Sequence, residues 1–150
     1  PPVEARIKAA RKVFDAGYEV RIRIDPMVPV DGWERKYKEL VDAIFDNLYP
    51  ERITLGTLRG LQKTIIYARR AGKDTTWVRF LEEDSQWGKK IRFALRVRMY
   101  KTVIDYLVNK YGYPNDKIAL CKETPTVWRV LGKEPGAYPD WKGCKCNCVW

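Results

Sequence analysis

Short apolar strands alternate with amphipathic helices along most of the chain, and this order constrains the fold more than any other feature. β-Branched and apolar residues predict strands at 18–25, 52–57 and 117–121. Apolar residues at helical spacing predict helices over 3–16, 33–48, 61–70, 95–111 and 124–131. Strands joined through helices run parallel, because each helix returns the chain to the same end of the sheet. The sequence therefore predicts an α/β fold with parallel strands.

The alternation is interrupted once and lacks a strand at its start. Residues 72–94 fit neither a helix nor a clean crossover, so we expect an inserted loop or hairpin there. The first element is a helix with no strand before it, which favours the C-terminal part of a longer α/β protein. A complete small domain with a leading helix is the alternative, since 150 residues suit one domain.

The charge of the chain narrows the functional classes. Lys and Arg number 29 against 19 Asp and Glu, a net charge of +10 at pH 7. This excess suits a polyanionic partner, and equally a solvated surface of the kind that heat-adapted proteins carry.

Histidine is absent, which excludes Ser-His-Asp and Cys-His nucleophile systems. No long apolar run and no leader is present, so we expect a cytoplasmic protein without a membrane partner.

Polar side chains follow the carboxyl ends of the three predicted strands. The candidates at these ends are Asp25, then Thr57 with Arg59, and finally Cys121 with Lys122 and Glu123. In parallel α/β folds the loops at these ends converge, so we expect these residues to share one site. The alternative is that Asp25 and Thr57 cap turns and that Lys122 and Glu123 form a surface ion pair.

The four cysteines allow several interpretations. Cys121 ends an apolar strand, where a free cysteine is most often a small buried hydrophobe. Lys122 and the following helix start could instead lower its thiol pKa and make it reactive. Cys144, Cys146 and Cys148 lie in a Cys-rich tail, residues 133–150, without the spacing of a zinc knuckle. They are either loose thiols or soft-metal ligands, with Cys121 as a fourth ligand.

Basic and aromatic residues interleave between positions 77 and 98. Cations contact phosphates and flat rings stack on bases, so this segment predicts a nucleic-acid surface. The alternative is that the apolar residues face the core while the basic ones are merely solvated. The candidate nucleic-acid-binding residues are Trp77, Arg79, Trp87, Lys89, Lys90 and Arg92.

Six stretches in this order resemble the C-terminal half of spore photoproduct lyase-like radical S-adenosylmethionine proteins. They are EARIKAARKVFDAGYEV, RIDPMVPVDGW, ITLGTLR, GKKIRF, RMYKTVIDYL and LCKETPTVW. The resemblance implies that residues 1–132 are the C-terminal part of a partial (β/α)6 TIM-like barrel, with the inserted basic segment at 72–94. It implies a [4Fe–4S] cluster that cleaves S-adenosylmethionine, and a radical that acts on a thymine dimer in DNA.

The resemblance also implies what this chain lacks. The C-x3-C-x2-C cluster motif of the family lies upstream of the matched stretches, so the parent protein would hold the cofactors and this chain alone is expected to be inactive. By position, Asp25 and the loop formed by Gly32 and Trp33 match the barrel region near the cofactor, so the resemblance implies that Trp33 is a further pocket residue. Lys89, Lys90 and Arg92 match the basic segment that faces DNA.

The expected partners are the missing N-terminal half, a nucleic acid and a second copy of the chain. The nucleic acid is DNA, or RNA if the chain comes from a branch of the family that acts on another substrate. The second copy would pair through the open edge of the sheet. Two other functions remain open from the residues alone. They are a non-catalytic basic nucleic-acid-binding module and a Cys-rich metal-binding domain.

Overall fold

The computed structural model describes residues 1–85 and 88–133 of the chain. Three strands form the main sheet in the order β1-β2-β6: β1 (Arg21–Met27), β2 (Arg52–Thr57) and β6 (Ile118–Leu120). Both strand pairs are parallel, with Ile22 opposite Ile53 and Ile53 opposite Ile118. The prediction of an α/β fold with parallel strands is therefore confirmed for this sheet.

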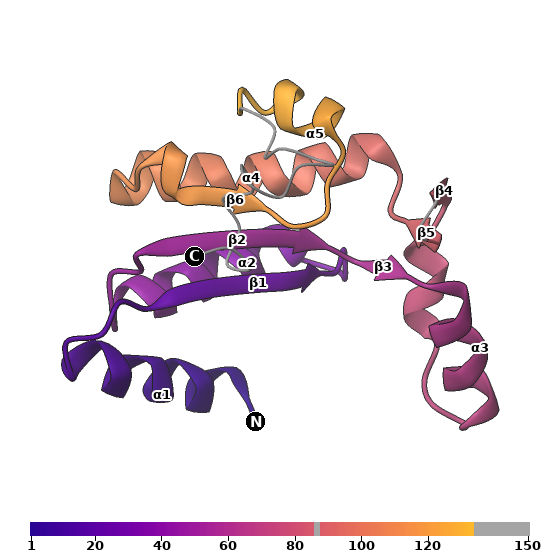
Figure 1. Cartoon of the computed structure of the whole chain (residues 1–150), viewed down its shortest axis with the longest axis horizontal. Helices are drawn as coiled ribbons and strands as arrows, with labels where there is room; N and C mark the ends of the chain where they lie inside the picture. The colour runs from indigo at the N-terminus through magenta and orange to yellow at the C-terminus, as the bar shows by residue number, and fades with distance from the viewer. Residues whose placement is uncertain (86–87, 134–150) are drawn as a thin grey trace.

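Two long helices cover the sheet because each is a crossover between parallel strands. α2 (Trp33–Phe45) connects β1 to β2, and α4 (Phe93–Tyr111) precedes β6. The two helices pack against each other, and α5 (Pro125–Val130) packs on α4 (Figure 1). Buried apolar side chains of these elements form the core with β2, whose Ile53 and Leu55 are fully buried. The central position of β2 explains its continuous apolar run.

A second, smaller sheet lies in the connection that leads from β2 to α4. It has the order β3-β5-β4 and consists of β3 (Arg59–Gly60), β4 (Glu83–Ser85) and β5 (Gly88–Lys90), all antiparallel. Gly88 has φ +115°, and a Cβ there would lie 2.4 Å from the Gly60 carbonyl oxygen, so only glycine permits this close pairing. The inserted hairpin, which the sequence predicts within 72–94 as one of two possibilities, is present, and β3 adds a third antiparallel strand to it.

Two helices lie at opposite ends of the molecule. α1 (Val3–Asp15) contributes no buried residue, and α3 (Gln62–Arg70) projects from the end where β3 leaves the main sheet (Figure 1). Two short 3-10 helices, η1 (Thr76–Phe80) and η2 (Asn115–Lys117), complete the elements. Among the described residues no helix combines the length and the apolar character needed to cross a membrane. The described strands form an open sheet and not a closed barrel.

Candidate functional site

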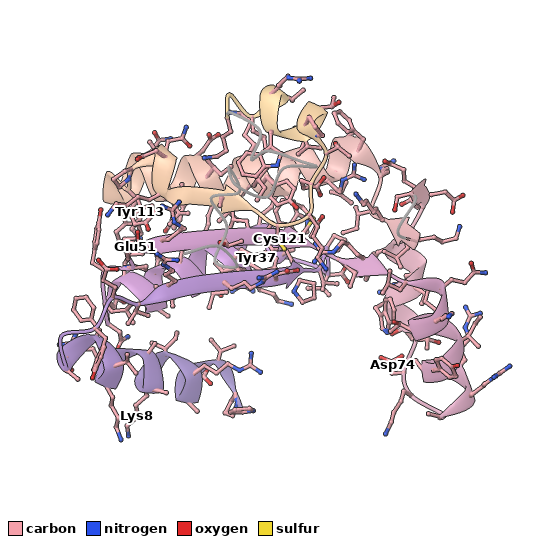
Figure 2. All side chains as sticks on the ribbon, in the orientation of Figure 1. Lys8, Tyr37, Glu51, Asp74, Tyr113 and Cys121 are labelled. Atoms are coloured by element: carbon pink, nitrogen blue, oxygen red, sulfur yellow. The ribbon has the colours of Figure 1, made fainter. Side chains whose placement is uncertain are left out.

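The carboxyl ends of the three parallel strands bring together residues that are far apart in the sequence. Asp25 lies near the C-terminal end of β1, Arg59 follows β2 after one residue, and Cys121 directly follows β6 at the position labelled in Figure 2. Arg59 Nη2 lies 3.1 Å from Asp25 Oδ2 and 3.9 Å from Cys121 Sγ. Arg23, two residues before Asp25 on β1, completes the group. These four side chains are called the rim cluster below.

Asp25 is paired with two guanidinium groups. Arg23 Nη2 donates to its Oδ2 at 2.9 Å, and Arg59 Nη2 contacts the same oxygen. Burial alone would raise the pKa of Asp25, but the hydrogen bonds and charges of Arg23 and Arg59 outweigh it and hold the pKa below its ordinary value. The carboxylate is therefore ionised at neutral pH and held by two arginines.

Cys121 is buried beside the same guanidinium groups. Arg23 Nη2 lies 2.6 Å from Cys121 Sγ, and the Cys121 amide donates to the Leu55 carbonyl at 2.7 Å. Burial, and then the charge of Asp25, raise the pKa of the thiol despite the two arginines. The suggestion that Lys122 lowers this pKa is wrong, because Lys122 is exposed and burial dominates. Cys121 is thus a protonated thiol.

Gly56 makes room for the rim cluster. A Cβ on Gly56 would lie 2.5 Å from the Cγ of Asp25 and within 2.9 Å of both carboxylate oxygens. Real Cβ atoms essentially never approach other atoms so closely. The absence of a side chain on β2 at this point therefore allows Asp25 to cross over the neighbouring strand and reach Arg59.

A second group of buried polar residues lies next to the rim cluster and is called the inner network here. Glu123 is its centre: its carboxylate accepts hydrogen bonds from Tyr100 Oη at 3.0 Å and from Thr57 Oγ1 at 3.3 Å. The side chain of Arg96 is 1% exposed and its Nε lies 3.3 Å from Glu123 Oε1, whose side chain is 2% exposed. This contact is an ion pair without hydrogen-bond alignment. Burial raises the pKa of Tyr100 far above its ordinary value, so its hydroxyl stays a donor.

The hairpin takes part in the inner network through two charged residues. Arg96 Nη1 lies 3.0 Å from Glu83 of β4 and also donates to the Ile91 carbonyl. Lys90 of β5 is only 6% exposed, and burial lowers the pKa of its ammonium group although Glu123 opposes this shift. Side chains alternate along a strand, so Lys89 points to solvent while Lys90 points inward. Lys90 therefore does not belong to the exposed basic surface that the sequence predicts.

Two of the predicted pocket residues lie outside both groups. Trp33, at the start of α2, is half-buried with its ring 6.5 Å from that of Tyr37 and 5.9 Å from the Arg98 guanidinium. Lys122 is exposed and has a left-handed backbone with φ 52°. Neither contacts the rim cluster through an interaction that the structure shows among the described residues.

The other nucleic-acid-binding candidates are dispersed around the hairpin. Arg79 is exposed above the Phe80 ring, and Trp77 is half-buried and donates to the Asp74 carbonyl at 3.1 Å. Lys89 pairs with exposed Asp84 at 3.2 Å, an interaction that an incoming phosphate can replace at little cost. Arg92 is exposed directly before α4. Trp87 lies outside the described residues.

Sequence reasoning missed several members of these groups, although two left a readable signal. Arg23 is two residues from Asp25 on a strand and therefore shares its face. Arg96 falls on the apolar stripe of α4 that continues through Met99 and Val103, where a charge indicates a buried partner. Gly56 left no signal, since its importance depends on the position of Asp25.

The described residues include no group of three or more His, Cys, Asp or Glu side chains able to hold a metal ion. Cys144, Cys146 and Cys148 lie outside the described residues. The rim cluster has one protonated thiol, and its one carboxylate is already held by arginines. These side chains suit the binding of polar or charged groups rather than of a metal.

Comparison with known proteins gives one family. The family model described as spore photoproduct lyase matches residues 1–126 of the chain. Comparison with curated proteins and with solved structures gives no match. The matched range contains all three strands of the main sheet, the hairpin and every member of the rim cluster. The chain therefore belongs to the spore photoproduct lyase family.

Proposed function

We propose that this chain is the C-terminal part of a radical S-adenosylmethionine enzyme that reverses thymine dimers in DNA. The observation that carries the proposal is the rim cluster, which gathers Asp25, Arg59 and Cys121 at the carboxyl ends of parallel strands. Active sites of (β/α) barrels lie at this end. Among the strands that the structure describes, β1 lies at the edge of the sheet, which suits a further strand, as in a partial (β/α)6 barrel completed by other residues of the protein.

The described residues do not fit an iron–sulfur cluster. Such a cluster needs several thiolates, and Cys121 is the one cysteine among residues 1–85 and 88–133. The cluster of the family would accordingly be held by residues elsewhere in the protein. S-adenosylmethionine, when bound with that cluster, supplies the radical chemistry of the family. The roles proposed below for the rim cluster do not require an iron–sulfur cluster bound to its residues.

The rim cluster would orient rather than react. Asp25 stays ionised because Arg23 and Arg59 hold its pKa down, so it offers a fixed acceptor to hydroxyl or ammonium groups. The two guanidinium groups also place positive charge beside the carboxylate, which favours an anionic group of a ligand near this end of the sheet. The thiol of Cys121 keeps its proton at neutral pH because burial raises its pKa. The preformed geometry lowers the cost of ordering a ligand at this end of the sheet.

The experiment uses the complete native protein, reconstituted with iron and sulfide under anaerobic conditions. Reduced enzyme with S-adenosylmethionine should restore thymine in an oligonucleotide that carries a spore-type thymine dimer. Asp25→Asn should lower the repair rate by at least about tenfold, because the fixed carboxylate is lost at the strand end. Asp31→Asn, in the exposed loop after β1, is the matched control and should leave the rate unchanged.

Two results would count against the proposal. A reduced and fully loaded enzyme that leaves the dimer intact would contradict the repair activity. If that enzyme nevertheless bound oligonucleotides with a steep salt dependence, the chain would instead be a non-catalytic nucleic-acid-binding module. Equal repair by the Asp25→Asn and Asp31→Asn variants would contradict the role given to the rim cluster.

A further inference from the structure

α3 is held to the molecule by a small part of its surface. Ile65 is the buried residue of this helix and Ala68 is half-buried, while the other seven positions are exposed. Figure 1 shows α3 projecting from the end of the molecule where β3 leaves the main sheet. Most of the helix surface is therefore open to a partner.

The exposed face of α3 combines cations with large apolar groups. With 3.6 residues per turn, Lys63, Tyr67 and Arg70 lie roughly opposite Ile65, while Ile66 lies about a quarter turn from it. Tyr67 is 62% exposed and Ile66 is 39% exposed. Tyr67 lies four residues after Lys63 and three before Arg70, so its exposed ring and the two cations share one face of the helix. The arrangement indicates an interaction surface.

No acidic residue offsets the positive charge of this segment. The chain contains no Asp or Glu between Glu51 and Asp74. Among the described residues, Lys63, Arg69, Arg70 and Lys73 make no ion pair. In contrast, Lys89 on the hairpin is paired with Asp84. The cations of α3 are thus available to an anionic partner without breaking an existing contact.

We propose that α3 is a docking surface for the nucleic acid on which the enzyme acts, an inference that rests on the proposed function. Lys63 and Arg70 contact backbone phosphates, and the exposed ring of Tyr67 stacks on a base or sugar that a distorted duplex presents. The sequence predicts a nucleic-acid surface between positions 77 and 98, in η1 and the hairpin. The helix α3 would add a second contact surface to it. Nucleic acid fits this surface because its phosphates complement the charges of Lys63 and Arg70 and its bases can stack on the ring of Tyr67.

The position of α3 connects this surface to the rim cluster. β3 follows β2 after a single residue, carries Arg59 of the rim cluster, and leads through Leu61 into α3. A nucleic acid held along α3 would therefore approach the carboxyl ends of the strands, where the rim cluster lies. Leu61, itself 54% exposed, lies between the two.

A membrane surface would be the other anionic partner for a basic helix with an apolar face. α3 has only 9 residues, and its exposed apolar residues are few. Interfacial helices depend on a larger buried apolar area, so these features favour nucleic acid. The experiment includes anionic vesicles for this reason.

The test measures the salt dependence of binding by the native protein to a duplex that carries a thymine dimer. The Lys63→Gln/Arg70→Gln double variant should lower the magnitude of the slope of log K against log salt by about 1.8, because two phosphate contacts are lost. Tyr67→Ala should weaken binding about tenfold and leave the slope unchanged. Lys8→Gln/Lys12→Gln on α1, at the other end of the molecule, removes the same charge and should change neither quantity (Figure 2 labels Lys8).

The outcomes separate this inference from the proposed function. Wild-type protein that binds the duplex, with α3 variants whose slope and affinity match wild type, would overturn the role of α3 and leave the repair activity standing. Wild-type protein that binds no nucleic acid at low salt would overturn both. Binding to vesicles of mixed neutral and anionic phospholipid that the double variant abolishes, without an effect on DNA binding, would make α3 a membrane contact. Circular dichroism confirms that each variant is folded.

Discussion

Replacing Gly56 by alanine tests the geometry of the rim cluster most directly. The new methyl group would lie 2.5 Å from the Asp25 Cγ and 2.6 Å from one carboxylate oxygen, so Asp25 must move. The side chain of Asp25 is only 8% exposed, and moving it breaks the 3.1 Å contact with Arg59. The substitution therefore combines overpacking with the loss of an ion pair.

The magnitude follows from these two effects. Forcing a methyl group into a filled space costs about 1–3 kcal/mol. The lost pairing adds about 1 kcal/mol, well below the cost of breaking a fully buried pair, because the side chain of Arg59 is 24% exposed and that of Arg23 is 36% exposed. We expect Gly56→Ala to lower the free energy of unfolding by about 2–4 kcal/mol.

A double-mutant cycle separates this clash from a general intolerance of β2. In an Asp25→Ala background the carboxyl group is gone, so adding Gly56→Ala should cost less than about 1 kcal/mol. Urea denaturation followed by circular dichroism gives the four free energies of unfolding. If Gly56→Ala costs the same with and without the Asp25 carboxylate, the close approach described here does not limit the site.

Two further predictions concern ionisation at the rim cluster. The pKa of Asp25 is lowered from 3.8, so its contribution to stability is present above that pH and is lost as pH falls through the folded-state pKa. The difference in the free energy of unfolding between wild type and Asp25→Asn, measured in urea, should therefore shrink below about pH 4. A difference that stays constant would contradict the pairing. The buried thiol of Cys121, with its raised pKa, should react with iodoacetamide far more slowly than a free cysteine at pH 7.5, as followed by peptide mass mapping, and equal rates would show that it is exposed or ionised.

Much of the fold could be predicted because local patterns and the parallel sheet agree. Each predicted helix and strand of the main sheet is present with small shifts at its ends, for example β1 at Arg21–Met27 against a predicted 18–25. The antiparallel pairing of Arg59 with Lys90 could not be predicted, because β3 has only two residues and no periodicity. Pairing of such short strands depends on tertiary contacts rather than on local preference.

The candidate site was predicted in part for a comparable reason. The rule that parallel strands present their carboxyl ends at one edge correctly joined Asp25, Arg59 and Cys121 in one group. It gave no account of which side of the three-residue strand β5 faces inward, so Lys90 was expected at the surface. The predicted burial of Cys121 is confirmed, but the contribution of Asp25 to its raised pKa comes from a strand far away in the sequence, which a list of neighbouring residues does not show.

The inner network has a consequence for how this sequence can change over time. Glu83, Lys90, Arg96 and Glu123 come from the hairpin, from α4 and from the loop after β6, and two of them carry each sign of charge. A neutral residue in place of Glu123 would remove the buried carboxylate beside Arg96, whose side chain is 1% exposed, and would leave the partly exposed Glu83 as its ion-pair partner among the described residues. We expect substitutions at these positions to be coupled in evolution. The charged residues of the hairpin would then change together with those at the adjacent end of the main sheet.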